Sequence, residues 1–145
     1  MHASPVYELS CTLNSGCDCM RTLRYMVEAM SMRAGLNTIQ TNRMLVAVDE
    51  LFANISKHGY HGREGMIEMR ADLQDHRLRF EFRDYAPPIA DRHELRGREV
   101  DDVQPGGIGL RLIQAIMDEI HHSTMDDGNH WVLIKHLSEG DECDT

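Results

Sequence analysis

The sequence predicts a single α+β domain, a two-layer sandwich in which a mixed, mostly antiparallel sheet carries helices on one face. Three observations predict it. Short segments with apolar residues at every second position indicate half-buried strands, most of them joined to a sequence neighbour by a turn. Longer segments repeat apolar residues at helical spacing. The 145 residues suit one domain, residues 1–145, whose core we place at about residues 6–137.

The first third of the chain is expected to form one strand and two helices. Residues 7–13 alternate apolar and polar side chains, as a half-buried strand does. Asp18 can cap the first helix and Gly35 is a stop signal for it. The second helix is expected to run from about residue 38 to residue 58. The apolar stripe expected on the first helix comprises Leu23, Met26, Val27 and Met30.

A hairpin and a long loop follow. Residues 66–73 and 78–84 both alternate, and the turn at 74–77 joins them as a hairpin. Residues 85–107 are irregular and hold three of the four prolines. A loop of that length in a compact domain is usually functional or disordered.

The chain is expected to close with a helix and a second hairpin. Apolar residues at helical spacing predict a helix over residues 109–120. The segment 126–129 is a turn, and 131–137 is the last strand. We expect the polar residues 138–145 to be frayed.

The composition argues against two classes of partner. A net charge of −9 would repel a phosphate backbone, so direct nucleic-acid binding is not expected. The sequence has no run of about 18 apolar residues, so no membrane span is expected. The first residues lack the pattern of a signal peptide, and we expect a cytoplasmic protein.

The cysteines and histidines are expected to be structural or solvated. In a reducing compartment the four cysteines, including Cys17 and Cys19, stay as thiols. Two histidine pairs would hold a metal only with a further ligand cluster nearby. These pairs are His58 with His61, and His121 with His122.

The second helix carries polar residues away from its apolar stripe. Glu50, Asn54 and Lys57 recur at spacings of four and three, which places them on one side of an α-helix. A carboxylate, an amide oxygen and an ammonium suit a magnesium nucleotide, because magnesium takes hard oxygen ligands. The carboxylate can also accept or orient a hydroxyl proton. A solvated polar face explains the same pattern without any ligand.

Two further segments can bind parts of a nucleotide. The alternation of the second hairpin strand places Asp84 on the buried side, where its carboxylate needs a donor such as an adenine amino group. Alternatively, Asp84 caps the next turn. Gly106, Gly107 and Gly109 lead into a helix, so phosphate could approach its N-terminus closely. A flexible hinge is the alternative for these glycines.

The order of these segments resembles a known family. "ELFANISKHGY", "RDYAPPI" and "GGIGLRLI", with a long loop before the last, resemble the N box and the two glycine boxes of the GHKL ATPase superfamily. The match is best to the anti-sigma-factor serine kinases, which typically read "AVDE…NAxxHGY", "DxGPPxD" and "GGxGLxLI…MDE". The resemblance covers about residues 7–137 and implies the histidine-kinase-like ATPase fold.

The resemblance implies roles for the helix residues. Glu50 corresponds to the glutamate that acts as base or positions the attacking group, and is the expected catalytic residue. Asn54 corresponds to the asparagine that binds Mg²⁺. Lys57 and His58 hold positions that often approach the phosphates.

The resemblance also implies a base site, a lid and a phosphate site. Asp84 matches the aspartate that accepts from the adenine amino group, and residues 85–105 match the lid that closes on ATP. Ala86 stands where the family usually has glycine; its methyl is tolerated if φ is negative, and otherwise weakens nucleotide binding. Pro105, before the glycine pair, would stiffen the lid. The segment expected under the phosphates comprises Gly106, Gly107, Ile108, Gly109 and Leu110.

The function implied is that of an Mg-ATP-dependent protein kinase that doubles as a binding protein. It would phosphorylate a serine or threonine on a small antagonist of the anti-sigma factor, and bind a sigma factor or similar regulator in alternation. The rival hypothesis is a nucleotide-binding module that sequesters its partner without transferring phosphate. Ala86 favours the rival, whereas the retained Glu50 favours the kinase. The resemblance leaves a homodimer open.

Overall fold

The computed structural model describes residues 7–14, 19–88 and 107–138. Asp18, Cys17, Pro105, Gly106, most of the expected lid and residues 139–145 therefore lie outside the described residues. The elements are β1 (Tyr7–Asn14), α1 (Cys19–Arg33), α2 (Thr38–Asn54), η1 (Ile55–Gly59), β2 (Met66–Gln74), β3 (Arg77–Asp84), α3 (Gly107–Ile116), β4 (Glu119–Met125) and β5 (Gly128–His136).

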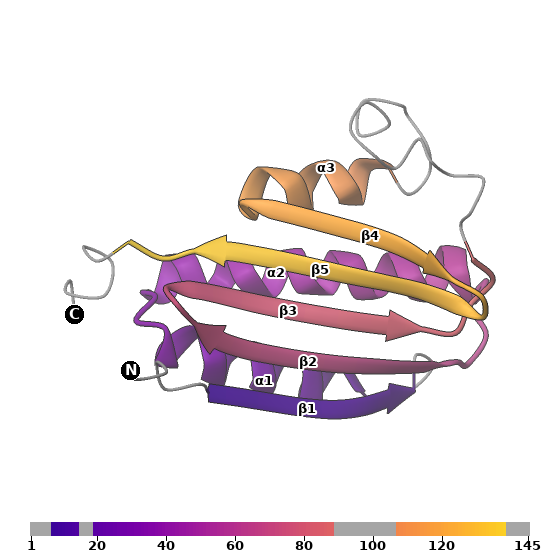
Figure 1. Ribbon diagram of the computed structural model, residues 1–145, viewed down its shortest axis with the longest axis horizontal. Coiled ribbons are helices and arrows are strands. Elements are labelled where there is room, and N and C mark those ends of the chain that lie inside the picture. Colours follow the sequence, from indigo (N-terminus) through magenta and orange to yellow (C-terminus); the bar gives the residue numbers. More distant parts are fainter. Residues whose placement is uncertain (1–6, 15–18, 89–106, 139–145) are drawn as a thin grey trace.

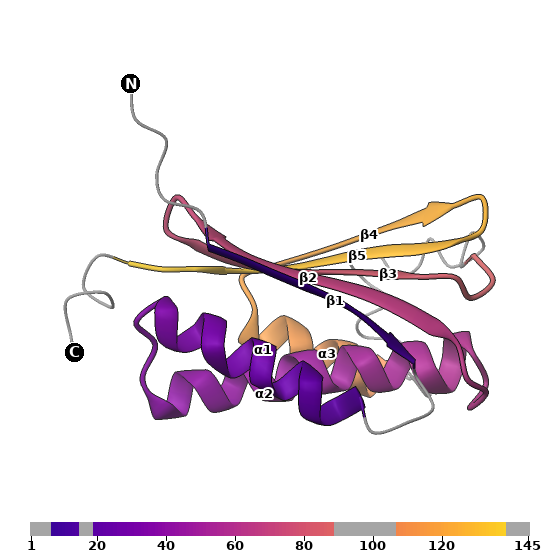
Figure 2. The same cartoon turned by 90° about the horizontal axis from the view of Figure 1, so that it is seen from below.

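The strands form one sheet in the order β1-β2-β3-β5-β4. Figure 2 shows α1, α2 and α3 together on one face of this sheet, which confirms the predicted two-layer α+β fold. Every strand pair of the described sheet is antiparallel, so this sheet is not mixed. The pairs β2–β3 and β4–β5 are hairpins, in which a short turn returns the chain beside its own strand, whereas helices lie between β1 and β2 and between β3 and β5.

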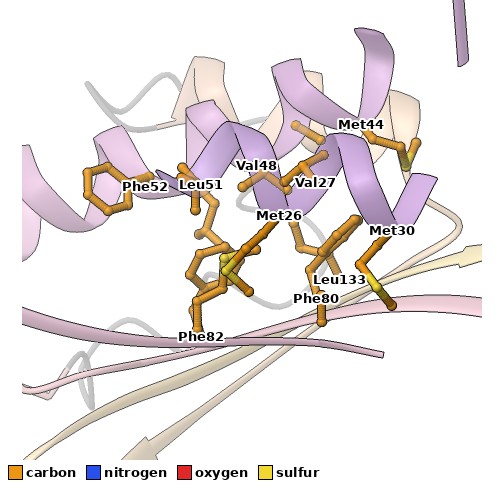
Figure 3. Close-up of a cluster of buried hydrophobic side chains, with 14 of the residues drawn as sticks. Met26, Val27, Met30, Met44, Val48, Leu51, Phe52, Phe80, Phe82 and Leu133 are labelled. Atoms are coloured by element: carbon orange, nitrogen blue, oxygen red, sulfur yellow. The ribbon is translucent and has the colours of Figure 1, made fainter. Parts of the chain in front are cut away.

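The core lies between the sheet and the helices. The inward side chains of β3, Leu78, Phe80 and Phe82, are fully buried, as the period-two pattern predicted. Figure 3 shows Phe80 and Phe82 facing the apolar stripes of α1 and α2. On the edge strand β1, Leu13 is buried but Leu9 is 39% exposed, so the predicted alternation is only partly buried there.

The ends of the first two helices follow local sequence signals. Gly35, at φ 85°, ends α1 as predicted: its N–H donates to Met32 O, and that of Leu36 to Ser31 O. Asn37 and Gln40 form a capping box at the start of α2, each side chain accepting from the other residue's backbone N–H.

Both predicted hairpins are confirmed, with corrected boundaries. The tight turn between β2 and β3 has positive φ at Asp75 and His76. The prediction of a helix as far as residue 120 is wrong: α3 ends at Ile116, and Ile120 lies in β4 opposite Leu133. Strand β5 begins at Gly128, three residues before the expected start. Among the described residues no helix is long and apolar enough to cross a membrane.

Candidate functional site

The C-terminal end of α2 presents Glu50 and Asn54. Both side chains are half-buried, as expected for residues beside the apolar stripe. Asn54 Nδ2 donates to the backbone oxygen of Glu50 at 3.0 Å. Because that oxygen can only accept, the amide nitrogen must face it, and Asn54 Oδ1 points the other way. Asn54 therefore offers an oxygen, the atom type that Mg²⁺ prefers.

The helix then widens into the π-helical turn η1. The N–H of Tyr60 donates to Ile55 O at 3.0 Å, five residues back. The α-helical spacing that placed Lys57 beside Glu50 and Asn54 does not hold across this turn. Lys57 and His58 are exposed, and within the described residues no hydrogen bond or ion pair joins them to Glu50 or Asn54.

Asp84, at the end of β3, is only 1% exposed, which confirms the predicted burial. Its Oδ1 accepts from the backbone N–H of Ala86 at 3.0 Å, so it also caps the following turn. Two side chains of β5 complete the arrangement: Asn129 Nδ2 donates to Oδ1 at 2.9 Å, and Trp131 Nε1 donates to Oδ2 at 3.1 Å. A carboxylate has about four acceptor positions, so Oδ2 retains room for one more donor.

Ala86 is turned toward Gly59, the last residue of η1. Ala86 is buried, and a Cβ built on Gly59 would lie 2.9 Å from the Ala86 methyl. The described non-glycine residues with positive φ are His61, Asp75 and His76, so the condition set for tolerating a methyl at position 86 is met.

Tyr60 joins the loop after η1 to the ends of β2 and β3. Its hydroxyl donates to Met66 O at 2.5 Å and accepts from the Tyr85 N–H at 2.8 Å. Burial raises the pKa of Tyr60, against the opposing effect of the Tyr85 N–H. The ring lies over Gly65, where any Cβ would collide with it. Sequence reasoning did not predict this role.

The predicted phosphate segment is described in part. Gly107 and Gly109 lie in the first turn of α3, and Leu110 is half-buried. Figure 1 shows the start of α3 at the same end of the sheet as the end of β3 and the C-terminal end of α2. The fold thus brings the three sequence motifs to one end of the molecule.

Sequence reasoning missed the contribution of the C-terminal hairpin. Asn129 and Trp131 donate to Asp84, and His122 contacts both of them. Their signal was a polar residue, Asn129, in phase with the inward-facing Trp131 and Leu133 of the same strand. Among the described residues no group of three or more His, Cys, Asp or Glu side chains is placed to hold a metal ion.

The chain is similar in sequence to two protein kinases. The chain is 26% identical over 140 residues to the serine/threonine-protein kinase BtrW of Bordetella bronchiseptica, covering 89% of this chain and 91% of that protein. It is 25% identical over 124 residues to the serine-protein kinase RsbW of Listeria innocua, covering 80% and 78%.

The chain also resembles a solved structure and matches a protein family. The structure of the RsbU and RsbW domains of Rv1364c from Mycobacterium tuberculosis matches 90% of this chain with a TM-score of 0.65 and 20% identity, and this chain spans 32% of that one. That likeness supports the fold. Residues 13–135 match the histidine kinase-like ATPase domain. The chain therefore belongs to the histidine kinase-like ATPase domain family, as its motifs predicted.

Proposed function

We propose that this chain is an ATP-dependent protein serine/threonine kinase that phosphorylates a small antagonist protein and binds a sigma factor or similar regulator in alternation. Family membership and relatives named as serine or serine/threonine kinases support the class of reaction. The observation that carries the proposal is Asn54, one turn after Glu50, whose amide oxygen faces away from the Glu50 backbone oxygen.

The residues present fit Mg-ATP. Asn54 Oδ1 would ligate Mg²⁺, with phosphate oxygens and water as the remaining ligands. The bound ion would neutralise charge on the phosphates. Asp84 would accept from the adenine amino group at the remaining position on Oδ2. The backbone N–H groups of Gly107 and Gly109, at the start of α3, would donate to phosphate oxygens.

Glu50 would act as the base. The serine oxygen would bond to the γ-phosphorus as the bond from that phosphorus to the leaving oxygen of ADP breaks. The hydroxyl proton would pass to the Glu50 carboxylate. Excluding water matters in such a site, because hydrolysis of ATP competes with transfer.

Titration calorimetry with Mg-ATP tests the site. Wild type should bind, and Asn54→Ala should lose the magnesium-dependent part of the affinity, about tenfold or more. Asn42→Ala is the matched control, because Asn42 is an exposed asparagine on the same helix. A wild type that fails to bind Mg-ATP would refute the proposal.

A phosphotransfer assay separates the kinase from the non-catalytic module. Transfer of labelled γ-phosphate to a purified antagonist protein should occur with wild type and fail with Glu50→Gln. If wild type binds Mg-ATP and the antagonist but transfers nothing, the chain is a nucleotide-binding module that sequesters its partner.

A further inference from the structure

The neighbour of Asp84 across the sheet is Asn129 of β5. Asn129 is 1% exposed, and its amide nitrogen donates twice, to Asp84 Oδ1 at 2.9 Å and to the backbone oxygen of Pro87 at 3.3 Å. One buried amide thus links the carboxylate to the start of the segment that follows β3.

The orientation of this amide is fixed by chemistry. The Pro87 oxygen can only accept, and Asp84 Oδ1 already accepts from the Ala86 N–H, so the Asn129 nitrogen must face both. Its Oδ1 then faces His122 Nε2 at 3.3 Å, and because an amide oxygen can only accept, this hydrogen bond requires a proton on Nε2. The two hydrogen bonds therefore form a donor series: His122 donates to Asn129, and Asn129 donates to Asp84.

Both oxygens of Asp84 are held from β5. Trp131 Nε1 donates to Oδ2, and His122 packs on the Trp131 ring with centroids 4.2 Å apart. The carboxylate cannot rotate without breaking a bond to Asn129 or to Trp131. Its one remaining acceptor position therefore points in a set direction.

We propose that Asn129 is a positioning residue for nucleotide binding. It aims the free acceptor position of Asp84 and, through the Pro87 oxygen, holds the described residues that follow β3. This inference rests on the proposed function, because it assumes that Asp84 receives the base of the nucleotide. It assigns to the C-terminal hairpin a part in ligand binding.

Other ionisable groups lie near this donor series. The charge of His130 lowers the pKa of His122, and Tyr60 and Arg83 lie near Asp84. Burial lowers the pKa of His122, against the opposing effects of Asn129 and Asp84. A charge introduced at position 129 would act on Asp84 and His122 first, because these two side chains bond to Asn129 directly.

Two substitutions at position 129 give different pH signatures. Asn129→Ala removes the bonds without adding charge, so affinity for Mg-ATP should fall about tenfold with an unchanged pH profile. Asn129→Asp places a second carboxylate beside Asp84. The two can share one proton at low pH, which restores the contact, but repel each other when both are ionised. Its affinity should therefore fall toward high pH.

Calorimetry with Mg-ATP between about pH 5.5 and pH 8 measures this, with Asn42→Asp as the control for added charge at an exposed site. The proposal is overturned if Asn129→Ala and Asn129→Asp bind with the affinity and pH profile of wild type. If Asn129→Asp unfolds at high pH, the Mg-ATP affinity of the folded Asn129→Ala variant alone decides whether the proposal stands.

The design separates this inference from the proposed function. A wild type that does not bind Mg-ATP refutes the proposed function and the nucleotide role together. A wild type that binds no better than the two variants refutes the positioning role alone. NMR titration of His122 tests the donor series without nucleotide: Asn129→Asp should raise the pKa of His122, and an unchanged pKa would refute that series.

Discussion

The contact between Gly59 and Ala86 predicts a strong coupling between two positions 27 residues apart, from 59 to 86. In Gly59→Ala the new Cβ would lie 2.9 Å from the Ala86 methyl, closer than carbon atoms pack. Neither carbon is the end of a flexible side chain, so backbone must move. Overpacking of this kind costs about 1–3 kcal/mol. Gly59 has no positive φ, so alanine fits its backbone. Alanine would also lower the conformational entropy of the unfolded chain, which offsets the loss by about 0.4–1 kcal/mol.

The expected net loss for Gly59→Ala is about 1–2 kcal/mol of unfolding free energy. Ala86→Gly alone should cost about 1 kcal/mol, from one buried methyl and a more flexible backbone. The double variant should be more stable than the sum predicts, because the clash is gone. Urea denaturation of the four proteins measures the cycle. A coupling below about 0.5 kcal/mol would refute the reasoning.

Three further predictions concern the surroundings of Asp84. Gly128→Ala should lose about 3 kcal/mol in urea denaturation, because its Cβ would collide with the Asp84 carbonyl; wild-type stability would contradict this. His122 has a pKa lowered chiefly by burial, so stability should fall as pH drops below about 6.5, where the unfolded chain takes the proton first; His122→Gln should lose less between pH 7 and 5. Tyr60→Phe should lose about 1–2 kcal/mol from two hydrogen bonds, whereas the exposed Tyr25→Phe should lose little by the same denaturation.

The sequence predicted what local pattern controls. The β2–β3 hairpin and the burial of Asp84 follow from alternation, which the structure confirms because one face of the sheet is covered by helices. The π-helical turn η1 was not predictable, because a single turn with a hydrogen bond between residues five apart is too short to produce a repeating pattern of apolar side chains. The end of α3 was misplaced because Ile120 fits helical spacing, yet it lies half-buried in a strand opposite Leu133.

The residues that hold Asp84 were missed for a different reason, which also bears on how the site is maintained. Asn129 reaches Asp84 only because β3 and β5 pair with these two residues opposite each other. A slip of one residue would turn Asn129 to the other face of the sheet. The next inward-facing pair in the same ladder is Phe82 with Trp131, both in the core. Core packing therefore sets the strand register that aims the carboxylate. Trp131 contributes to both the packing and the aim, because its ring lies in the core and its Nε1 donates to Asp84 Oδ2. Trp131→Phe should thus weaken nucleotide binding more than its loss of stability explains, because the ring is replaced but the donor is not.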